Sequence, residues 1–572
     1  MKYRWSPAPP QPALAAHLAQ ELRLAPLLVQ CLLNRGLSEP GPITNFLQPR
    51  LKNLADPFLL PNMDRAVERL LLARANDEPL VIFGDYDVDG VSATALLTEV
   101  LRALGWQVNH YLPHRLDEGY GLSQSGVENC LAKFPVTLLL AVDCGSTAVE
   151  AIDWLHGKGV DVLVLDHHQV SDPAPRALAV VNPQLAPASA PDFRELCSVG
   201  LAFKLAHALV KRGRELGLAA AADFDVRACL DLVALGTIAD VVPVVGENRI
   251  LVNSGLERLN ATQRPGLLAL MKVAEVSRPI TGHEVGYQLG PRLNAAGRLE
   301  NAQEALNLLL ARDEAEARPI AERLDAQNRE RQNIERGIAT EVIGAVRARF
   351  RPATDFVIVE GQLLWHIGVV GIVASRTLQE FYRPTIILGG DGHEWRGSGR
   401  SIEGFDLAAA LRECADLLVR HGGHAMAAGL TVHPDKVDAL RARLNELAAR
   451  TLKPEQLQPS LRLDAEIDLA ELSVERVAEL DKLQQTGIGN PPVHLFTRAI
   501  SHQRALQRLG AEKRHAKMWL TDGRTTKEAV LWGVGNGPLP VGKFDAAFAP
   551  QLNSYHGSVT VQLKILDWRP AA

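Results

Sequence analysis

The sequence is poor in cysteine and contains no long apolar run, and both absences limit what the chain can be. Only six cysteines occur in 572 residues, and no two of them form a Cys-x-x-Cys pair. The common zinc modules and a disulfide framework are therefore not indicated. No stretch reaches the ~18 uninterrupted apolar residues of a membrane helix. The first residues lack the apolar core of a secretory signal. We expect a cytoplasmic chain without a membrane partner.

An excess of positive charge is also missing. The chain has 61 lysines and arginines against 66 acidic residues, a formal net charge of −5. The field of the whole molecule therefore does not favour a nucleic acid or another polyanion. Any anionic substrate must be bound by a local basic groove or through metal ions. The length predicts about three or four domains.

One stretch, GDYDVDG at 84–90, organises the rest of the reading. The apolar residues 80–83 before it predict a buried strand, and residues 91–101 after it predict a helix. Asp85, Asp87 and Asp89 then lie where ligands bind in an open α/β sheet. Three carboxylates this close need a cation to stay ionised. Taken alone, the stretch could also be an acidic turn, which is the less favoured of the two interpretations.

Two further predicted strands end in residues of the same chemistry. Apolar segments at 106–112, 137–142 and 160–165 alternate with helical ones, which predicts a parallel sheet buried on both faces. Asp143 follows the segment at 137–142, and Asp166-His167-His168 follows the one at 160–165. Right-handed crossovers bring these ends to one edge. Carboxylate and imidazole groups together suit paired Mn²⁺ or Mg²⁺ ions that activate water.

Three other regions contain weaker candidates. Asp240 ends an apolar helical stretch and would need a metal ion or a local hydrogen bond. Arg292 and Arg298 flank small residues, where a guanidinium can reach phosphate, although exposed arginine is the simpler interpretation. Residues 300–350 are charged and helical, interrupted at Pro319, and indicate a connector between two lobes.

A second α/β lobe is expected from about 354 to 450, with strands at 355–359 and 384–388. Glycine-rich stretches at 365–376, 396–401 and 421–429 combine small residues with arginine, serine and histidine. Each could be a tight turn, but together they favour a phosphate cradle.

The last part, about 455–572, changes character. Strands at 517–520, 528–532 and 559–566 with glycine-rich turns indicate a small β-barrel. Basic residues beside tryptophans on such a barrel suit single-stranded nucleic acid, and a solvated face over core aromatics is the alternative.

The string GDYDVDG at 84–90, the triplet at 166–168 and GGHAMAAG at 422–429 together resemble the DHH phosphoesterase superfamily. The length, the leader and the barrel-like tail resemble the branch that degrades single-stranded DNA. The resemblance implies an α/β fold: a DHH parallel-sheet domain joined by a long helix to a second α/β (DHHA1) domain, plus a C-terminal β-barrel (OB-fold). We expect a leader at 1–75 that packs on the catalytic core, the DHH domain at 76–300, the connecting helix at 301–350, DHHA1 at 351–452 and the OB-fold at 453–572.

The resemblance also implies roles for individual residues. The metal ligands for two Mn²⁺ or Mg²⁺ ions would be Asp87, Asp89, Asp143, His167 and Asp240, with Asp143 bridging the ions. Asp85 would lie at the edge of the site or bind directly, and His168 would contact the scissile phosphate or orient a ligand. Substrate phosphates, including the 5′-terminal one, would be held by Arg115, Arg292 or Arg298, Ser398 and Arg400. His366, Arg376 and His424 match DHHA1 motif positions and are further substrate-binding candidates.

The activity implied is a metal-dependent 5′-to-3′ exonuclease that releases 5′-mononucleotides from single-stranded DNA. The substrate would be single-stranded DNA with a 5′ end, in repair and recombination, with a helicase and a single-strand-binding protein as candidate partners. Two alternatives stay open. One is a DHH-type phosphodiesterase of short oligonucleotides or cyclic dinucleotides, or a pyrophosphatase. The other is a non-catalytic single-strand-binding scaffold.

Overall fold

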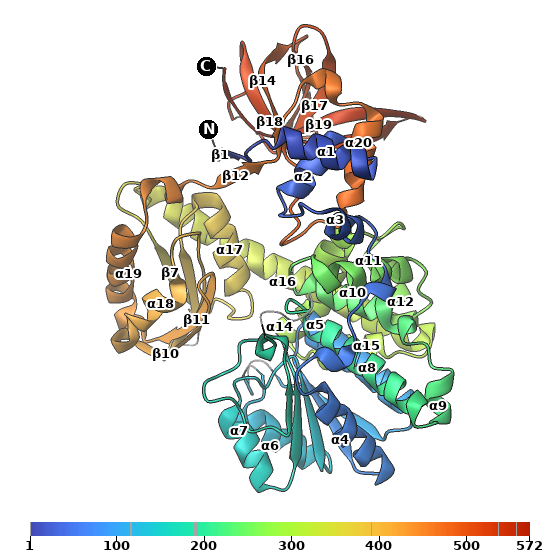
Figure 1. Cartoon of the computed structure of the whole chain (residues 1–572). Coiled ribbons are helices and arrows are strands. Elements are labelled where there is room, and N and C mark those ends of the chain that lie inside the picture. The colour runs from blue at the N-terminus through green and yellow to red at the C-terminus, as the bar shows by residue number, and fades with distance from the viewer. Residues whose placement is uncertain are drawn as a thin grey trace. The chain divides into compact units, whose positions relative to one another are not determined.

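The computed structural model describes residues 2–114, 117–119, 121–187, 193–390, 392–535, 537–555 and 557–571. The chain forms two compact units (Figure 1). Unit 1 contains Met1–Ser38, Glu330–Lys482 and Pro492–Ala572, and unit 2 contains Glu39–Arg329 and Leu483–Pro491. Among the helices of these described ranges, none is both long enough and apolar enough to span a membrane.

Unit 2 is built on a five-stranded parallel sheet, which confirms the expected fold class. Its strand order is β3-β2-β4-β5-β6, with every neighbouring pair parallel. The strands are β2 (Leu80–Gly84), β3 (Val108–Tyr111), β4 (Leu138–Val142), β5 (Asp161–Leu165) and β6 (Ala179–Val181). Alternate side chains enter two different cores: Leu80 and Ile82 point to one face, and Val81 and Phe83 to the other. The chain therefore needs helices on both faces.

Helices cover the two faces unequally. On one face α6 (Gln124–Lys133) and α7 (Val149–Gly157) bury a small core. The larger core on the other face includes the following helices: α4 (Met63–Ala75), α5 (Val88–Ala103), α8 (Ser198–Glu215), α10 (Leu230–Ala239), α11 (Gly246–Asn260), α12 (Pro265–Val273) and α15 (Gln303–Leu309). Helix α10 is apolar all round and largely buried, so the residue that ends it, Asp240, is carried on a rigid support.

One helix packs directly on the acidic loop that follows β2. It is α14 (Gly290–Leu299), preceded by α13 (Gly282–Glu284) and the π-helical turn η5 (Val285–Leu289). A Cβ on Gly297 would lie 2.8 Å from the carbonyl oxygen of Tyr86, so only glycine allows this approach. Asn294 accepts a hydrogen bond from the Val88 amide at 3.2 Å. Helix α14 therefore fixes the backbone of the loop.

The long connecting helix is continuous where an interruption was expected. Helix α16 spans Glu314–Arg349 with Pro319 inside it. Proline removes one backbone hydrogen bond and disfavours the helix. The neighbouring Ala317, Ile320, Ala321 and Leu324 are buried in the core of unit 2, and this packing keeps the helix intact. The expectation of a break at Pro319 was wrong.

The second α/β lobe, in unit 1, has a five-stranded sheet of order β10-β11-β9-β8-β7. Its strands are β7 (Ile358–Leu363), β8 (Thr385–Gly390), β9 (Trp395–Arg400), β10 (Leu418–Gly423) and β11 (Ala427–Val432), and its helices are α17 (Val370–Phe381), α18 (Leu407–Arg412) and α19 (Val437–Thr451). The stretch at 396–401 is mostly strand, and 421–429 is largely a hairpin. A Cβ on Gly397 or Gly399 would come within 2.4 or 2.5 Å of Leu388 and Leu407, so these glycines serve packing and not turns.

The C-terminal part is a seven-stranded sheet of order β13-β14-β18-β19-β17-β16-β15. The strands are β13 (Ala465–Glu466), β14 (Leu495–His502), β15 (Gln507–Leu509), β16 (His515–Thr521), β17 (Thr526–Leu531), β18 (Phe544–Tyr555) and β19 (Ser558–Pro570), with α20 (Val474–Leu480) beside them. Strand β14 pairs with both β18 and β16, so the sheet curves back on itself as an OB-type barrel requires.

The leader divides between the two units instead of packing as one piece. Strand β1 (Arg4–Pro7) pairs in parallel with β12 (Ser460–Leu463), and Arg35 forms an ion pair with Asp464 at 3.4 Å. Of its helices, α1 (Pro12–Leu22) and α2 (Pro26–Leu33) belong to unit 1, and α3 (Pro40–Leu47) belongs to unit 2. Residues 1–38 thus belong to unit 1 and residues 39–75 to unit 2, and the expected leader domain at 1–75 stays a prediction. Within unit 1, the apolar α2 buries most of its side chains.

The segment 483–491, which we term the clasp, belongs to unit 2 although both its neighbours in sequence belong to unit 1. The buried Arg249 guanidinium donates to the carbonyl oxygens of Phe46 at 2.7 Å and Gln484 at 2.8 Å, and lies over the Phe46 ring. Asn490 closes the clasp by donating to the carbonyls of Leu483 and Gln485, both at 2.7 Å.

Replacing this guanidinium should loosen the clasp. In Arg249→Leu the carbonyls of Phe46 and Gln484 stay buried without their donor, which costs about 1–3 kcal/mol for each group. We expect the free energy of local opening at 483–491 to fall by about 2 kcal/mol, or roughly 30-fold faster amide exchange. Hydrogen–deuterium exchange measures it. Arg258→Leu, at an exposed position of the same helix, should leave the exchange unchanged, and equal protection in both variants would contradict this account.

Candidate active site

Seven acidic and imidazole side chains predicted from the sequence come together in unit 2. Asp85, Asp87 and Asp89 lie at the junction of β2 and α5, and Asp143 follows β4. His167 and His168 follow β5, and Asp240 ends α10. Possible ligand atoms form three groups, and within each group the atoms lie within 4.8 Å of one another. Two of the groups share Asp143: Asp85, Asp87 and Asp143, and Asp143, His167 and His168. The third is Asp89, Cys197 and Asp240. The edge of the sheet is therefore a dense cluster of ligand atoms.

Backbone amides hold the carboxylates of the first loop. Asp87 is the N-cap of α5, and its Oδ1 accepts from the amides of Asp89 at 2.9 Å and Gly90 at 3.1 Å. The buried Asp89 carboxylate accepts from the first amides of α8, Ser198 at 2.7 Å and Val199 at 2.8 Å. A helix N-terminus stabilises a negative charge placed there. Two helix starts therefore fix these two carboxylates.

Asp143 occupies the centre of the cluster. Its φ of 63° lies in the left-handed region, which is uncommon for a residue other than glycine. Its Oδ1 accepts a hydrogen bond from Ser198 Oγ at 2.8 Å and lies 3.6 Å from His167 Nε2. The side chain is 2% exposed, so the carboxylate faces the other ligand candidates and not solvent.

Asp166 orients the two histidines. Its Oδ1 accepts from the amides of His167 at 2.8 Å and His168 at 3.2 Å, and lies 2.7 Å from His168 Nδ1. Its Oδ2 accepts from the Ser146 amide at 3.0 Å. The imidazole of His167 then points Nε2 at both Asp143 and Asp240, at 3.6 Å each. Asp166 is thus a support and not a member of the ligand groups.

Burial and mutual repulsion shift the acidity of the cluster. Burial, and then the charge of Asp87, raise the pKa of Asp89 to about 7. Burial, and then the charges of Asp89 and Asp87, raise the pKa of Asp240 to about 9, and that of Asp143 is also well above its usual range. Burial alone would lower the pKa of His168, but the hydrogen bond and charge of Asp166 raise it to about 9. The positive charge of His168 therefore compensates the repulsion among the acids only in part.

A divalent cation fits this cluster. His167 Nε2 and Asp240 Oδ2 are buried atoms without a hydrogen-bond partner, and they face each other at 3.6 Å. Buried polar atoms in folded proteins normally have a partner, so these two atoms are placed to bind a metal ion. Carboxylate oxygens with imidazole nitrogen suit Mn²⁺, and carboxylates suit Mg²⁺.

Sequence reasoning missed two kinds of residue here. Ser198 bonds Asp89 through its amide and Asp143 through its hydroxyl, and the buried Cys197 lies within the group of Asp89 and Asp240. The only signal in the sequence for these two residues is that they begin a helix, whose first amides can bind a carboxylate. Asn294 was missed because its role, holding the Val88 amide, depends on tertiary packing.

The arginines predicted to bind phosphate differ in their surroundings. Arg292 donates to Asp325 at 2.9 Å and to the Gln288 carbonyl at 2.7 Å, so it is held inside unit 2. Arg298 lies in the last turn of α14, one residue after the glycine that contacts the acidic loop. Arg115 falls outside the described residues.

Ser398 and Arg400 form a pair in unit 1. Alternate residues of β9 share a face, and Arg400 Nη1 donates to Ser398 Oγ at 3.0 Å. A Cβ on Gly371, in the first turn of α17, would lie 2.9 Å from Ser398 Oγ and 3.2 Å from Arg400 Nη2. Both side chains therefore lie beside a helix N-terminus, the arrangement that binds phosphate in proteins.

The remaining three candidates for substrate binding each have different contacts. His366 Nδ1 accepts from the Gly368 amide at 3.1 Å, just before α17. Arg376 forms an ion pair with the buried Glu335 at 2.5 Å, which gives it a structural role on α16. His424 is exposed in the turn between β10 and β11, where its amide donates to the Ala427 carbonyl.

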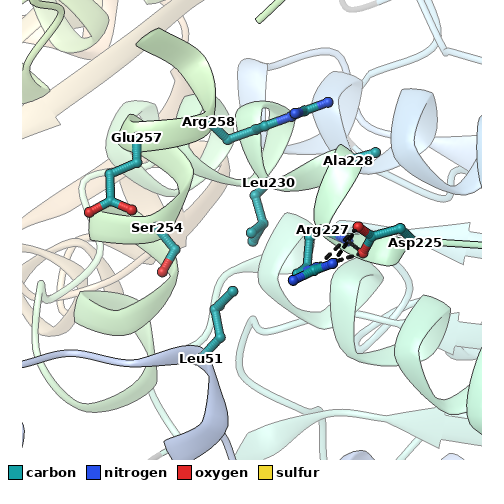
Figure 2. Close-up of a pocket in the computed structure, with 8 residues that line it drawn as sticks. All are labelled: Leu51, Asp225, Arg227, Ala228, Leu230, Ser254, Glu257 and Arg258. Atoms are coloured by element: carbon teal, nitrogen blue, oxygen red, sulfur yellow. Dashed lines mark hydrogen bonds and ion pairs between the residues drawn. The ribbon is translucent and has the colours of Figure 1, made fainter. Parts of the chain in front are cut away.

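A separate hollow in unit 2 contains none of these residues. Figure 2 shows this pocket, of about 330 Å³. In it Arg227 is engaged by Asp225, with nitrogen–oxygen distances of 2.8 to 3.1 Å. The pocket is lined by Leu51, Asp225, Arg227, Ala228, Leu230, Ser254, Glu257 and Arg258. With that charge pair satisfied internally, we place no chemistry there.

The raised pKa values predict how stability depends on pH without metal. Unfolded aspartates ionise near pH 4, whereas Asp89 and Asp240 do so at about 7 and 9 in the folded chain. The folded state then binds more protons between these values, so its stability falls as the pH rises. His168, whose pKa is raised to about 9, contributes stability that is present below pH ~6.5 and is also lost as the pH rises through about 9.

Thermal unfolding in EDTA should therefore show a midpoint several degrees lower at pH 8 than at pH 5.5. Mg²⁺ should raise the midpoint more at pH 8, because protons compete with the metal at the lower pH. Asp240→Asn should reduce both the pH slope and the response to Mg²⁺. A midpoint in EDTA that rises between pH 5.5 and 8 would contradict the assignment.

Family models match three consecutive parts of the chain. The DHH family N-terminal domain matches residues 79–237, the DHHA1 domain 354–450 and the RecJ OB domain 463–567. These matches confirm the three folds expected from the sequence.

Whole-length relatives agree. The chain is 36% identical to the single-stranded-DNA-specific exonuclease RecJ of Bacillus subtilis, over 99% of this chain and 71% of the relative. It is 34% identical to the RecJ exonuclease of Escherichia coli over 95% of each. The crystal structure of RecJ in complex with Mn²⁺ from Thermus thermophilus superposes with a TM-score of 0.85 and 30% identity, covering 100% of this chain and 80% of that one. The chain therefore belongs to the RecJ family of DHH proteins.

Proposed function

We propose that the chain is an exonuclease specific for single-stranded DNA that depends on Mn²⁺ or Mg²⁺, removes nucleotides from the 5′ end and releases 5′-mononucleotides. One observation carries the chemistry: the buried His167 Nε2 and Asp240 Oδ2 face each other without a hydrogen-bond partner, inside a cluster of carboxylates. Relatives that cover nearly the whole chain are named single-stranded-DNA-specific exonucleases, and solved relatives hold Mn²⁺ or Mg²⁺.

The ligand set we propose has two parts that share one residue. Asp87, Asp89, Asp143, His167 and Asp240 would hold two ions, with Asp143 contributing to both and Asp85 at the edge. When bound, the ions would supply a water nucleophile and offset the charge on the attacked phosphate and the leaving 3′ oxygen. Asp143 is oriented by the Ser198 hydroxyl, and the histidines are oriented by Asp166.

His168 has the surroundings of a phosphate contact. The hydrogen bond from its Nδ1 to Asp166 at 2.7 Å fixes the ring and favours the protonated form at neutral pH. A positively charged imidazole beside the metal ligands can bind a non-bridging oxygen of the scissile phosphate and stabilise the charge that develops there.

The start point of digestion would be set by a phosphate cradle. Ser398, Arg400 and the first amides of α17 offer a hydroxyl, a guanidinium and a helix N-terminus to one anion. We propose that this cradle receives the 5′-terminal phosphate, and that Arg115 and Arg298 contact other phosphates of the strand. His366 and His424 stay candidates for the same strand, and Arg292 and Arg376 would act through their ion pairs.

The C-terminal sheet would bind the strand without reading its sequence. On β16 the alternate residues Lys517 and Trp519 face outward, and the Arg504 guanidinium lies 3.5 Å from the centre of the Trp519 ring. Trp532 is 52% exposed with His515 against it. Aromatic faces and basic groups suit single-stranded nucleic acid. A helicase and a single-strand-binding protein would be the partners of such an enzyme.

The direction of digestion is tested with end-labelled DNA. With Mn²⁺, DNA labelled at the 5′ end should release labelled mononucleotide at once, whereas DNA labelled at the 3′ end should shorten gradually. Asp143→Ala should reduce the rate by more than about 100-fold because the shared ligand is lost. Glu150→Ala, an exposed acid on the helix after β4, should retain full activity. Cleavage of dinucleotides only would favour the short-oligonucleotide alternative, and binding without cleavage would favour the scaffold.

The cradle predicts a preference for a 5′ phosphate. Arg400→Met should reduce the ratio of kcat/KM between 5′-phosphorylated and 5′-hydroxyl DNA by about tenfold, since a charge-assisted hydrogen bond to phosphate is lost. Arg412→Met, at an exposed position of α18, serves as the matched control. An unchanged ratio in Arg400→Met would remove Arg400 from the cradle.

A further inference from the structure

Three segments of unit 2 meet beside Asp240, and each touches the other two. The segment after α10 meets the clasp, because the Val244 amide donates to the Ile488 carbonyl at 2.8 Å. The clasp meets the start of α13, because Gln485 Oε1 accepts from the Gly282 amide at 3.2 Å.

The third contact joins η5 and α14 to the end of α10. A Cβ on Gly286 would lie 4.0 Å from Ile238, and one on Gly290 would lie 3.5 Å from Ala239. With these three contacts, 238–245, 282–290 and 485–490 form a closed triangle of segments.

Each segment of this triangle exposes a large apolar or aromatic side chain. Val241 is 60% exposed, Ile488 55% and Tyr287 75%. Scattered apolar residues on a surface need no explanation, but these three come from three segments that converge. We call Val241, Tyr287 and Ile488 the rim patch.

Two local features hold the rim patch in place. Val241 has a φ of 63°, a conformation that is a genuine outlier for a β-branched residue, and it directly follows the metal-ligand candidate Asp240. Tyr287 lies in the π-helical turn η5, with the His283 ring 4.9 Å from its own and tilted by 34°. π-helical turns are frequent at functional sites, and here the turn carries Tyr287, the aromatic residue of the patch.

We infer that the rim patch is a stacking surface for nucleobases of the strand, with Tyr287 as its main contact; this inference rests on the proposed function. Val241 directly follows a proposed ligand of the metal cluster, so the patch would lie beside nucleotides next to the scissile phosphate. Base faces stack on aromatic rings without regard to sequence. Apolar side chains do not bind phosphates, so the phosphates of the strand would be bound by the basic groups of the enzyme. The patch is thus a binding surface separate from the metal ligands.

The experiment compares Tyr287→Ala and Tyr287→Phe on two substrates with Mn²⁺. One is ordinary single-stranded DNA, and the other carries a run of abasic nucleotides after its 5′ end. On ordinary DNA we expect Tyr287→Ala to raise KM about tenfold with a smaller change in kcat, and Tyr287→Phe to stay within about twofold of the wild type. On the abasic run the wild type and Tyr287→Ala should be equal, because no base is present to stack. Leu216→Ala, which removes an exposed leucine elsewhere in unit 2, is the matched control.

Two outcomes would overturn the inference: equal KM values for Tyr287→Ala and the wild type on ordinary DNA, or the same loss on ordinary and abasic DNA. A change in sedimentation of Tyr287→Ala without a change in KM would assign the patch to a second copy of the chain instead. A wild type without any nuclease activity would overturn the proposed function itself. In that case DNA binding by Asp143→Ala, with and without Tyr287→Ala, still decides on stacking.

Discussion

The burial of carboxylates that repel one another is the constraint on which the rest of unit 2 depends. Asp85, Asp89 and Asp143 are each at most 2% exposed, and the pKa values of Asp89 and Asp143 are raised, chiefly by burial. Charges placed this close destabilise the fold unless donors or cations compensate. The N-termini of α5 and α8 and the Ser198 hydroxyl donate hydrogen bonds to carboxylates of the cluster, and Asp166 orients the two histidines. Metal ions would supply the remaining positive charge. The function therefore uses an arrangement that the fold alone would avoid.

Glycine is the second constraint, because it allows backbone to approach backbone at the points where ligands are placed. Gly90 and Gly297 approach the acidic loop so closely that a Cβ would lie 2.7 and 2.8 Å from its carbonyl oxygens. In the other unit Gly371 brings the first turn of α17 beside Ser398 and Arg400. In all three cases the absence of a Cβ on glycine allows a close approach that positions a functional side chain.

Much of this could be predicted from the sequence. Strand ends followed by Asp and His are local patterns, and a parallel sheet converts them into proximity, so the cluster from Asp85 to His168 and the two α/β folds were accessible. Tertiary contacts were not. Nothing in the sequence indicates that Arg376 pairs with Glu335, or that Ser198 bonds Asp143. The packing role of the glycines at 397 and 399 could not be predicted, because close packing and tight turns both require glycine. The pairing of β1 could not be predicted either, because its partner lies more than 450 residues away in sequence.

The pairing of β1 with β12 has a consequence for how the chain is made. Its partner residues, Arg4 and Ser460, are separated by almost the whole of the protein. At a synthesis rate of about 5–20 residues per second, the first strand leaves the ribosome on the order of half a minute to a minute and a half before its partner exists. Unit 2 can complete most of its core in that interval, whereas unit 1 cannot close its small two-stranded sheet. During translation residues 4–7 therefore have no strand partner until the ribosome has passed Leu463, and the sheet that joins these two segments of unit 1 is among the last parts of the chain that can form.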